Sequence, residues 1–449
     1  MLAGGACLAL AALSLLVSRQ PTYDPTAWLI WGREILHGDL FTTAGPSWKP
    51  LPILVTLPAA VLDKGGQQDV WLLVARIGTL AALVLSYRLA WRLEGPVAGV
   101  IAAAALLVSS GYLTRTFRGD SEGLLVALAF GAIEAHITGR RRLAFALLVA
   151  TALLRPEMWL FAGLYGLWLA WFGVPPARRA QTVALVAGVG AVMVAAWLIP
   201  EEIGSGRLLR AASRALEPVA GSPATASVPF VATFTNAAPV LPWPLYAAGV
   251  FYVVWALRGA DRRPQRALVL ALAVIATALM VIVALMAEMG FTGNSRYLTI
   301  PIALTGILGG AGLVRIASLA RSGLAPRGAA AAVGVVAALA VVFFVLAGFR
   351  TRDQVRKGMY ESARYAALPS ALASVGGAKA VLACGRVYTE WFDVQTVARA
   401  LGVRMSQVSI DPAVPGTVVA RRGATIADPR RFPAQRLTDK WVFATSCRR

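Results

Sequence analysis

Two short clusters near the start of the chain combine residue types that could carry out chemistry at a membrane. Tyr23-Asp24-Pro25 supplies a carboxylate, and Ser47-Trp48-Lys49-Pro50-Leu51 supplies an ammonium group between an indole and a proline. A carboxylate can take the proton of an attacking hydroxyl group, and an ammonium group can stabilise a phosphate. Charged side chains near lipid are costly to hold, so we expect Asp24 and Lys49 to act on a charged, lipid-linked substrate.

The composition places these clusters in a membrane protein. The 449 residues are 58% hydrophobic and only 14% charged, with a mean hydropathy of +0.66. Because long apolar runs recur, the predicted fold is an α-helical polytopic membrane protein. The net charge of +21 does not indicate nucleic acid as a partner, since the basic residues lie mostly in short loops between apolar runs.

Apolar windows of about 20 residues predict about eleven transmembrane helices. With the N-terminus inside, the expected inner loops carry fourteen arginines against three acids, in agreement with the positive-inside rule. We interpret the first helix as retained rather than as a signal peptide, because Ser-Arg-Gln-Pro is a poor cleavage site. The expected helices cover residues 2–18, 71–91, 97–113, 122–138, 143–154, 158–173, 180–199, 239–257, 266–288, 297–316 and 328–348.

The expected topology divides the chain into a transmembrane domain, residues 1–348, and an extracytoplasmic domain, residues 349–449. The first outer loop, 19–70, contains an amphipathic stretch that suits an interfacial helix and an apolar stretch too short to span. The outer loop 200–238 is rich in Gly, Ser, Pro and Thr and suits a mobile lid. An interfacial aromatic belt is expected from Trp28, Trp31, Trp48, Trp71, Trp159 and Trp243.

The last hundred residues have a mixed pattern that predicts a small α/β domain. Their seventeen basic and seven acidic residues suit anionic headgroups or an acidic polymer, or form an ordinary solvated surface. Cys384 and Cys447 either form a disulfide or remain free thiols. Helices are expected at 354–374 and 390–402, and strands at 380–384, 405–410, 416–421 and 441–446.

The charged residues at the outer boundary match what sugar transfer from a polyprenyl phosphate requires. The phosphate departs readily when cations stabilise it, and the acceptor hydroxyl needs a carboxylate base. Asp24 is the candidate base, and Lys49, Arg155 and Arg296 are the candidate donor-phosphate partners.

The order of these motifs over residues 1–316 resembles the GT-C superfamily of integral membrane glycosyltransferases, which includes protein O-mannosyltransferases and lipid A aminoarabinose transferases. Tyr23-Asp24-Pro25 occupies the place of a catalytic Asp in the first outer loop. Trp48-Lys49-Pro50-Leu51 is similar to an acid-Lys-Pro-Pro-Leu stretch whose Lys lies near the donor phosphate. The resemblance implies inversion at the anomeric carbon, which the residues themselves leave open.

Three further motifs are similar to the family in a looser way. Asp120-Ser121-Glu122 lies where relatives often carry another acid, so Asp120 and Glu122 are expected to orient acceptor or sugar hydroxyls. Arg155-Pro156-Glu157 resembles an Arg-Pro-Glu near the outer end of a middle helix, and Asn294-Ser295-Arg296-Tyr297 resembles an Arg-Tyr pair before a late helix. Further substrate contacts are expected from Tyr23, Trp48, Glu157 and Tyr297.

The chain departs from the family pattern at two places. Trp48 replaces the acid before Lys-Pro, and Pro25 stands where many relatives carry a second acid. The two histidines, His37 and His136, form no metal-binding motif. We therefore predict no metal and no cofactor, since the sequence does not support a divalent metal site.

Each candidate also has a purely structural interpretation. Asp24 could cap a helix that begins near Ala27, and Lys49 could extend to lipid headgroups. Arg296 could bind lipid phosphate in general. Ion pairs between neighbours in the sequence would account for the rest: Asp120 with Arg118 or Arg115, and Arg155 with Glu157.

The leading hypothesis is a glycosyltransferase in a bacterial cytoplasmic membrane, with its site on the outer side. Its partners would be a polyprenyl-phosphate sugar donor, membrane lipids and a glycan, lipid or protein acceptor. The competing hypothesis is a transporter or a flippase for lipid-linked precursors, and a third possibility is a non-catalytic partner of a cell-wall assembly. The acids cluster at outer helix ends rather than at mid-membrane, which favours surface chemistry.

Overall fold

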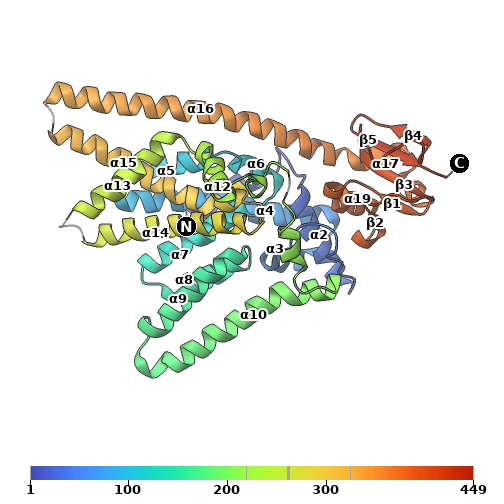
Figure 1. Ribbon diagram of the computed structural model, residues 1–449, viewed down its shortest axis with the longest axis horizontal. Coiled ribbons are helices and arrows are strands. Elements are labelled where there is room, and N and C mark those ends of the chain that lie inside the picture. Colours follow the sequence, from blue (N-terminus) through green and yellow to red (C-terminus); the bar gives the residue numbers. More distant parts are fainter. Residues whose placement is uncertain (1, 219, 260–262, 324, 448–449) are drawn as a thin grey trace.

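A bundle of long apolar helices and a small C-terminal mixed sheet make up the molecule (Figure 1). The computed structural model describes residues 2–218, 220–259, 263–323 and 325–447, so Asp261 and Arg262 of one expected inner loop lie outside the described residues. The helices of the bundle are α1 (Leu2–Ser14), α4 (Lys64–Glu94), α5 (Pro96–Val108), α6 (Tyr112–Arg118), α7 (Glu122–Ile137), α8 (Arg141–Ala152), α9 (Trp159–Phe172), α10 (Arg179–Ser205), α13 (Trp243–Arg258), α14 (Arg263–Glu288), α15 (Thr299–Gly323) and α16 (Pro326–Ala366).

Fewer helices than expected are long enough to cross a membrane singly. Within the described ranges, five qualify by length and composition, and seven if each of two bent pairs counts as one span. One bent pair joins α5 and α6, and the other joins Pro229–Val240 to α13. Some expected spans form shorter helices, such as α5 with 13 residues where 97–113 was expected, because its apolar run is broken before α6. The chain is thus a multi-pass membrane protein, but the expected count of eleven is not confirmed.

The first outer loop folds into helices, as its patterns predict. They are α2 (Tyr23–Leu36), α3 (Pro50–Thr56) and the short 3₁₀ helix η1 (Pro58–Val61). Pro50 begins α3, a position where the missing N–H of proline costs no intrahelical hydrogen bond. Helix α3, which begins directly after residue 49, therefore fixes one side of the backbone that carries Lys49.

The aromatic belt expected from the tryptophans is wrong for four of them. Trp28, Trp31, Trp48 and Trp71 are almost completely buried. Trp28 packs against Trp71 with ring centroids 5.0 Å apart, and Trp31 packs against Trp48 at 5.3 Å. The first loop folds back on itself and on the bundle, so these rings form its core. Trp243 is largely exposed, and its place in an interfacial belt stays a prediction.

The remaining connections of the bundle contain short helices. The segment 200–238, expected as a mobile lid, is partly helical. The short elements are η2 (Pro156–Met158), η3 (Pro176–Arg178), α11 (Arg210–Ala215), η4 (Pro223–Thr225), α12 (Pro229–Ala237), η5 (Ala238–Val240) and η6 (Ser295–Leu298).

Helix α16 connects the bundle to the C-terminal domain. It has 41 residues, runs along one edge of the bundle, and continues through residue 349 without interruption (Figure 1). The C-terminal elements are α17 (Leu368–Ser374), α18 (Gly377–Leu382), β1 (Arg386–Tyr388), η7 (Trp391–Asp393), α19 (Val394–Leu401), η8 (Met405–Gln407), β2 (Val408–Ser409), β3 (Gly416–Arg421), β4 (Ala434–Leu437) and β5 (Trp441–Thr445).

The C-terminal sheet has the strand order β2-β1-β3-β5-β4. β1 pairs in parallel with β2 and β3, whereas β5 pairs antiparallel with β3 and β4. The helices expected at 354–374 and 390–402 and the strands at 416–421 and 441–446 are confirmed. The strand expected at 380–384 is wrong, because most of this apolar run belongs to α18, and a short apolar run fits a buried helix as well as a strand. The strand expected at 405–410 shrinks to β2, and β4 was not expected.

A disulfide cross-links the C-terminal domain internally, and a shared hydrophobic core joins this domain to the first loop. A disulfide connects Cys384 to Cys447, so these cysteines are not free thiols. One hydrophobic core contains Trp31 and Ile53 of the first loop together with Val397 and Trp441 of the C-terminal domain. The first loop is therefore packed between the bundle and the C-terminal domain.

Candidate active site

Asp24 lies in the first turn of α2, where its side chain is buried. Its Oδ2 accepts a hydrogen bond from Lys49 Nζ at 3.3 Å and another from Arg296 Nη2 at 2.5 Å. The expectation that Asp24 caps a helix beginning near Ala27 is wrong, because α2 begins at Tyr23. The carboxylate binds two cations from distant parts of the chain instead.

Lys49 points inward from the residue that precedes α3. Its backbone is extended, with φ −142° and ψ 117°, as steric contact with the following Pro50 requires. Its Nζ lies 5.0 Å from the centroid of the Trp28 ring, and the side chain is only 6% exposed. Lys49 is therefore buried against Asp24 and does not extend to lipid headgroups.

Glu122 and Arg155 form a second buried ion pair beside the first. Glu122 is the first residue of α7, and its Oε1 accepts a hydrogen bond from Arg155 Nη2 at 2.8 Å. Arg296 Nε lies 3.3 Å from the same oxygen, so Arg296 bridges Glu122 and Asp24. We call Lys49, Asp24, Arg296, Glu122 and Arg155 the central charge cluster. Its three cations and two carboxylates leave one positive charge, which suits an anionic ligand.

Tyr297 and Glu157 lie differently with respect to this cluster. The guanidinium group of Arg155 stacks over the Tyr297 ring, 4.5 Å from its centroid. The expected ion pair between Arg155 and Glu157 is wrong, because Arg155 pairs with Glu122. Among the described residues, Glu157 makes no ion pair within 4.0 Å, so the structure brings Tyr297 to the cluster but leaves Glu157 outside it.

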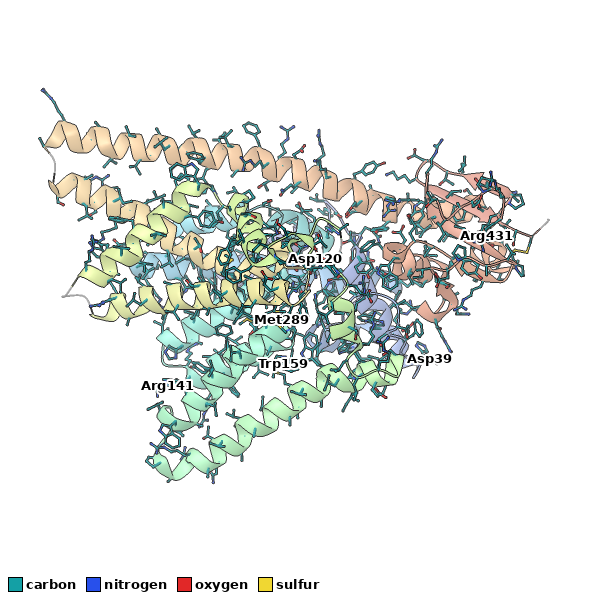
Figure 2. The ribbon with its side chains drawn as sticks, viewed as in Figure 1. Asp39, Asp120, Arg141, Trp159, Met289 and Arg431 are labelled. Atoms are coloured by element: carbon teal, nitrogen blue, oxygen red, sulfur yellow. A yellow bond between two sulfur atoms is a disulfide. The ribbon has the colours of Figure 1, made fainter. Side chains whose placement is uncertain are left out.

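Asp120 lies in the loop before α7, at the end of the bundle that faces the C-terminal domain (Figure 2). The expected ion pair of Asp120 with Arg118 or Arg115 does not form within 4.0 Å in the described ranges, and Arg118 lies 3.3 Å from Glu361 instead, although the charges of both arginines still act on Asp120. Burial raises the pKa of Asp120 and the nearby Glu122 carboxylate raises it further, while the charges of Arg118 and Arg296 oppose this shift only in part. Asp120 therefore keeps its proton more readily than an exposed carboxyl group does.

The pKa values of the Asp24 carboxyl and of the Lys49 ammonium group both depart from their usual values. Burial acts to raise the pKa of the Asp24 carboxyl, but the charges of Arg296 and Lys49 outweigh it and hold the pKa below its usual range. Burial lowers the pKa of the Lys49 ammonium group to about 8, although Asp24 acts in the opposite direction. At neutral pH Asp24 is ionised, and Lys49 is mostly protonated.

The C-terminal domain contributes aromatic residues that no sequence pattern placed at the site. The Phe392 ring packs edge-on against Tyr23 with centroids 5.1 Å apart, and Gln395 Nε2 donates to the Tyr23 carbonyl at 3.3 Å. The Trp391 ring lies 4.6 Å from the Arg214 guanidinium. No local pattern could reveal these contacts. Those of Tyr23 with Phe392 and Gln395 join residues more than 300 positions apart, and that of Trp391 joins the C-terminal domain to Arg214 of the outer loop.

A second set of residues, which the sequence did not reveal, holds the loop segment that leads to Lys49. The Arg210 guanidinium donates to the carbonyl of Pro46 at 2.7 Å and to that of Gly45 at 2.8 Å. Glu201 Oε1 accepts from the Trp48 amide at 3.2 Å. Trp48 is buried, and its Nε1 donates to the carbonyl of Ala196 at 3.0 Å, so its ring supports the loop from inside. The acids and arginines at the start of loop 200–238 were the available signal.

The carboxylates of the cluster are already bound by cations. Asp24 pairs with Lys49 and Arg296, and Glu122 pairs with Arg155. In the part of the chain that the structure describes, no group of three or more His, Cys, Asp or Glu side chains is close enough to hold a metal ion. The arrangement can bind an anion through its cations and accept a proton on a carboxylate.

Comparison with known proteins gives matches among solved structures. No protein-family model and no curated protein matches the sequence. ArnT from Cupriavidus metallidurans bound to undecaprenyl phosphate matches over 99% of this chain and 97% of its own, with 15% identity and a TM-score of 0.59. Its apo form gives 16% identity and a TM-score of 0.56 over 98% and 97%.

A second solved protein has a similar arrangement. It is the archaeal oligosaccharyltransferase AglB from Archaeoglobus fulgidus in complex with an inhibitory peptide and a dolichol-phosphate. It matches over 93% of this chain and 69% of its own, with 14% identity and a TM-score of 0.51. At these identities the likeness concerns the fold alone, and the fold of this chain is similar to those of ArnT and AglB.

Proposed function

We propose that this protein is a glycosyltransferase that moves a sugar from a polyprenyl-phosphate donor to an acceptor at the outer face of a bacterial cytoplasmic membrane. The observation that carries the proposal is the central charge cluster, in which Asp24 is buried between Lys49 and Arg296. A solved structure of the same fold holds undecaprenyl phosphate, which supports the class of donor.

The cations would bind the donor phosphate. Arg296 is the most exposed of the three, with 28% of its side chain accessible against 6% for Lys49 and 3% for Arg155. Arg296 would meet the phosphate first, and Lys49 and Arg155 would complete the binding. Fixed positive charges stabilise the negative charge that develops on the leaving phosphate. This proposal assigns that stabilisation to side chains and includes no resident cofactor.

Asp24 would act as the general base. The acceptor oxygen attacks the anomeric carbon while Asp24 takes the hydroxyl proton, and the bond from that carbon to the phosphate oxygen breaks, so polyprenyl phosphate leaves with the electron pair. Without donor, Lys49 and Arg296 hold the pKa of Asp24 low, which makes it a weak base. When the donor phosphate binds Lys49 and Arg296, these cations would stabilise the ionised Asp24 less. Asp24 would therefore become a stronger base only when the donor is present.

The remaining site residues would bind the sugar and the acceptor. Asp120 and Glu122 are proposed to orient hydroxyl groups, Tyr23 and Tyr297 to contact the substrates, and Glu157 to act only from outside the cluster. The acceptor would be a glycan, a lipid or a protein. The disulfide between Cys384 and Cys447 supports an oxidising, extracytoplasmic location for the C-terminal domain.

The competing function is transport or flipping of a lipid-linked precursor. Transporters place ionisable side chains on broken helices near the bilayer midplane. Here the buried charges gather where helices begin, at residues 24, 122 and 296, beside the first loop and the C-terminal domain. That position favours chemistry at the membrane surface over passage through it.

The decisive experiment measures release of polyprenyl phosphate from labelled polyprenyl-phosphate sugars by the purified protein. We expect turnover by the wild type and a loss of at least about a hundredfold in Asp24→Asn, because general-base catalysis contributes roughly 10²–10⁴-fold. The matched control is Asp69→Asn, which removes an acid near the start of α4 that pairs with the exposed Arg19.

Two results would count against the proposal. Equal turnover by Asp24→Asn and wild type would remove Asp24 as the base. Absence of turnover with every donor, together with movement of labelled donor across vesicle membranes, would favour the flippase instead.

A further inference from the structure

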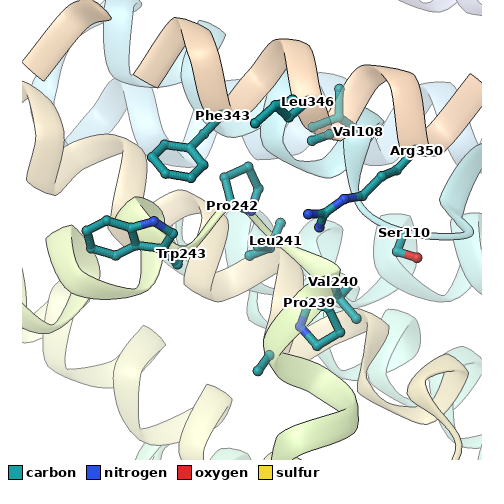
Figure 3. Close-up of a pocket in the computed structure, with 12 residues that line it drawn as sticks. Val108, Ser110, Pro239, Val240, Leu241, Pro242, Trp243, Phe343, Leu346 and Arg350 are labelled. Carbon is teal, nitrogen blue, oxygen red and sulfur yellow. The ribbon is translucent and has the colours of Figure 1, made fainter. Parts of the chain in front are cut away.

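A hollow lies where α16 passes two breaks in the helix bundle (Figure 3). One break separates α5 from α6 at residues 109–111, and the other separates η5 from α13 at Leu241–Pro242. The cavity has a volume of about 160 Å³. Apolar side chains form most of its wall, and its two polar lining residues are Ser110 and Arg350.

The helix breaks satisfy their own hydrogen bonds, so the hollow is not needed to hydrate them. Gln354 of α16 accepts a hydrogen bond from the Gly111 amide at 2.7 Å and donates one to Ser110 Oγ at 2.6 Å. Thr351 Oγ1 donates to the Val108 carbonyl at 2.9 Å, and the Ser110 amide donates to the Val240 carbonyl at 3.1 Å. The space that remains is apolar, and water gains little from filling it.

One end of the hollow is cationic and the other is aromatic. The Arg350 guanidinium reaches in from the end opposite Phe343 and Trp243, whose rings meet edge to face at 5.6 Å (Figure 3). Arg350 is exposed and forms no ion pair within 4.0 Å in the described part of the chain. Ser110 Oγ accepts from Gln354 and retains its own proton for an oxygen of a ligand.

The cationic end lies where the apolar surface of α16 stops. Large apolar side chains of α16 are exposed from Val335 to Phe349, and Arg350 and Arg352 follow immediately. Such a change from apolar to basic surface marks the level at which hydrocarbon gives way to headgroups. Arg350 is therefore at headgroup depth, with the hollow beside it on the hydrocarbon side.

We propose that this hollow binds one anionic phospholipid, with its headgroup phosphate on Arg350 and part of an acyl chain between Phe343 and Trp243. The charge balance favours an anionic lipid, because Asp353 is already bound by Arg356 at 2.9 Å and by Lys357 at 3.4 Å. A cavity of about 160 Å³ accepts only a segment of a chain, so the rest of the lipid lies along the exposed face of α16. The site is separate from the central charge cluster and does not depend on the proposed transferase activity.

The test measures lipid binding to the purified, delipidated protein rather than turnover. Wild type is titrated with phosphatidylglycerol and with phosphatidylcholine, and bound lipid is counted by native mass spectrometry. We expect one phosphatidylglycerol to bind at least about tenfold more tightly than phosphatidylcholine, and Arg350→Gln to lose this preference, since charge-assisted hydrogen bonds are the strong ones. Arg350→Lys should keep part of it.

Arg356→Gln is the matched control, because Arg356 lies on the same helix, pairs with Asp353 and does not line the hollow. Ala347→Phe should fill the hollow and displace the lipid while leaving Arg350 in place. The proposal is overturned if phosphatidylcholine binds equally well, if Arg356→Gln weakens binding as much as Arg350→Gln, or if undecaprenyl phosphate displaces the bound lipid and occupies the site in preference to phosphatidylglycerol.

Discussion

Opposite charges alternate through the central cluster, and this alternation makes several buried ions tolerable. A buried ion that loses every partner costs roughly 3–5 kcal/mol, and in the cluster each carboxylate has two cations, so removal of one cation leaves no carboxylate unpaired. Lys49 and Arg296 compensate Asp24, and Arg155 compensates Glu122. The uncompensated positive charge then remains for a ligand. The charges of these individual residues thus explain both the stability of the site and its preference for an anion.

Removal of the Lys49 charge should affect the donor more than the acceptor. We expect Lys49→Ala to raise the donor KM at least about tenfold, because it removes a charge-assisted contact with phosphate, and to change the acceptor KM little. Steady-state kinetics with each substrate varied in turn measures both constants. Lys357→Ala, which removes an exposed lysine paired with Asp353, is the control. Equal losses for donor and acceptor would contradict the phosphate assignment.

The lowered pKa of Lys49 predicts an alkaline limit to donor capture. The free enzyme loses the Lys49 proton as the pH rises through about 8, so kcat/KM for the donor should fall above that pH and stay level just below it. Lys49→Arg keeps its charge at high pH and should shift this limit upward. Profiles of kcat/KM from pH 6 to 10 compare the two proteins, and an unchanged limit in Lys49→Arg would assign it to another group.

At the scale of elements, the starts of several short helices position the cluster. Asp24 is in the first turn of α2, Lys49 directly precedes α3, Glu122 begins α7, Arg155 directly precedes η2, and Arg296 lies in η6. The helix that follows such a residue fixes its backbone. Its side chain can still point toward the segment that precedes the helix. The local geometry of five elements therefore sets the distances in one site.

Loop 43–48, which leads to Lys49, contains no helix or strand, and Arg210 should be needed to hold it. Arg210→Ala would leave the Gly45 and Pro46 carbonyls without their buried donor, and an unsatisfied buried group costs about 1–3 kcal/mol. We expect kcat/KM for the donor to fall about tenfold, because Lys49 follows this loop. Arg207→Ala, at an exposed position three residues earlier, should have no effect. Equal activity of both variants would show that Lys49 needs no support from Arg210.

At the scale of the whole molecule, the C-terminal domain and the first loop share one core. Leu29 and Trp48 belong to the same hydrophobic cluster as Leu368 and Met405. The sheet domain is thus not an independent appendage, and loss of its structure would expose the surface on which α2 rests. The contact between Phe392 and Tyr23 brings this coupling to the residue beside Asp24.

The disulfide should stabilise the site through this shared core. It closes a loop of 63 residues, for which the chain-entropy model gives about 4 kcal/mol. We expect the double variant Cys384→Ser with Cys447→Ser to melt at a lower temperature and to lose donor turnover at that lower temperature. Cys7→Ser, which removes the unpaired thiol in α1, is the control. Retention of turnover after the sheet has unfolded would show that the site does not depend on the domain.

Much of the architecture followed from local patterns. Long apolar runs predicted a helical membrane protein, and proline-punctuated apolar stretches predicted the loop helices around Lys49. Lengths of spans were harder to predict, since two pairs of helices bend by 61° and 108° at short breaks. The run at 380–384 was assigned to the wrong element, because a short apolar segment has no period that separates helix from strand.

The sequence by itself determined which residues had to be explained: Asp24 and Lys49 beside lipid, and later motifs with Glu122, Arg155 and Arg296. Tertiary structure alone decided their partners. Neighbouring charges predicted Arg155 with Glu157, yet Arg155 lies against Glu122. The physical reason is that a buried charge is stabilised by whatever opposite charge the fold brings within a few ångströms, and sequence distance does not measure that separation.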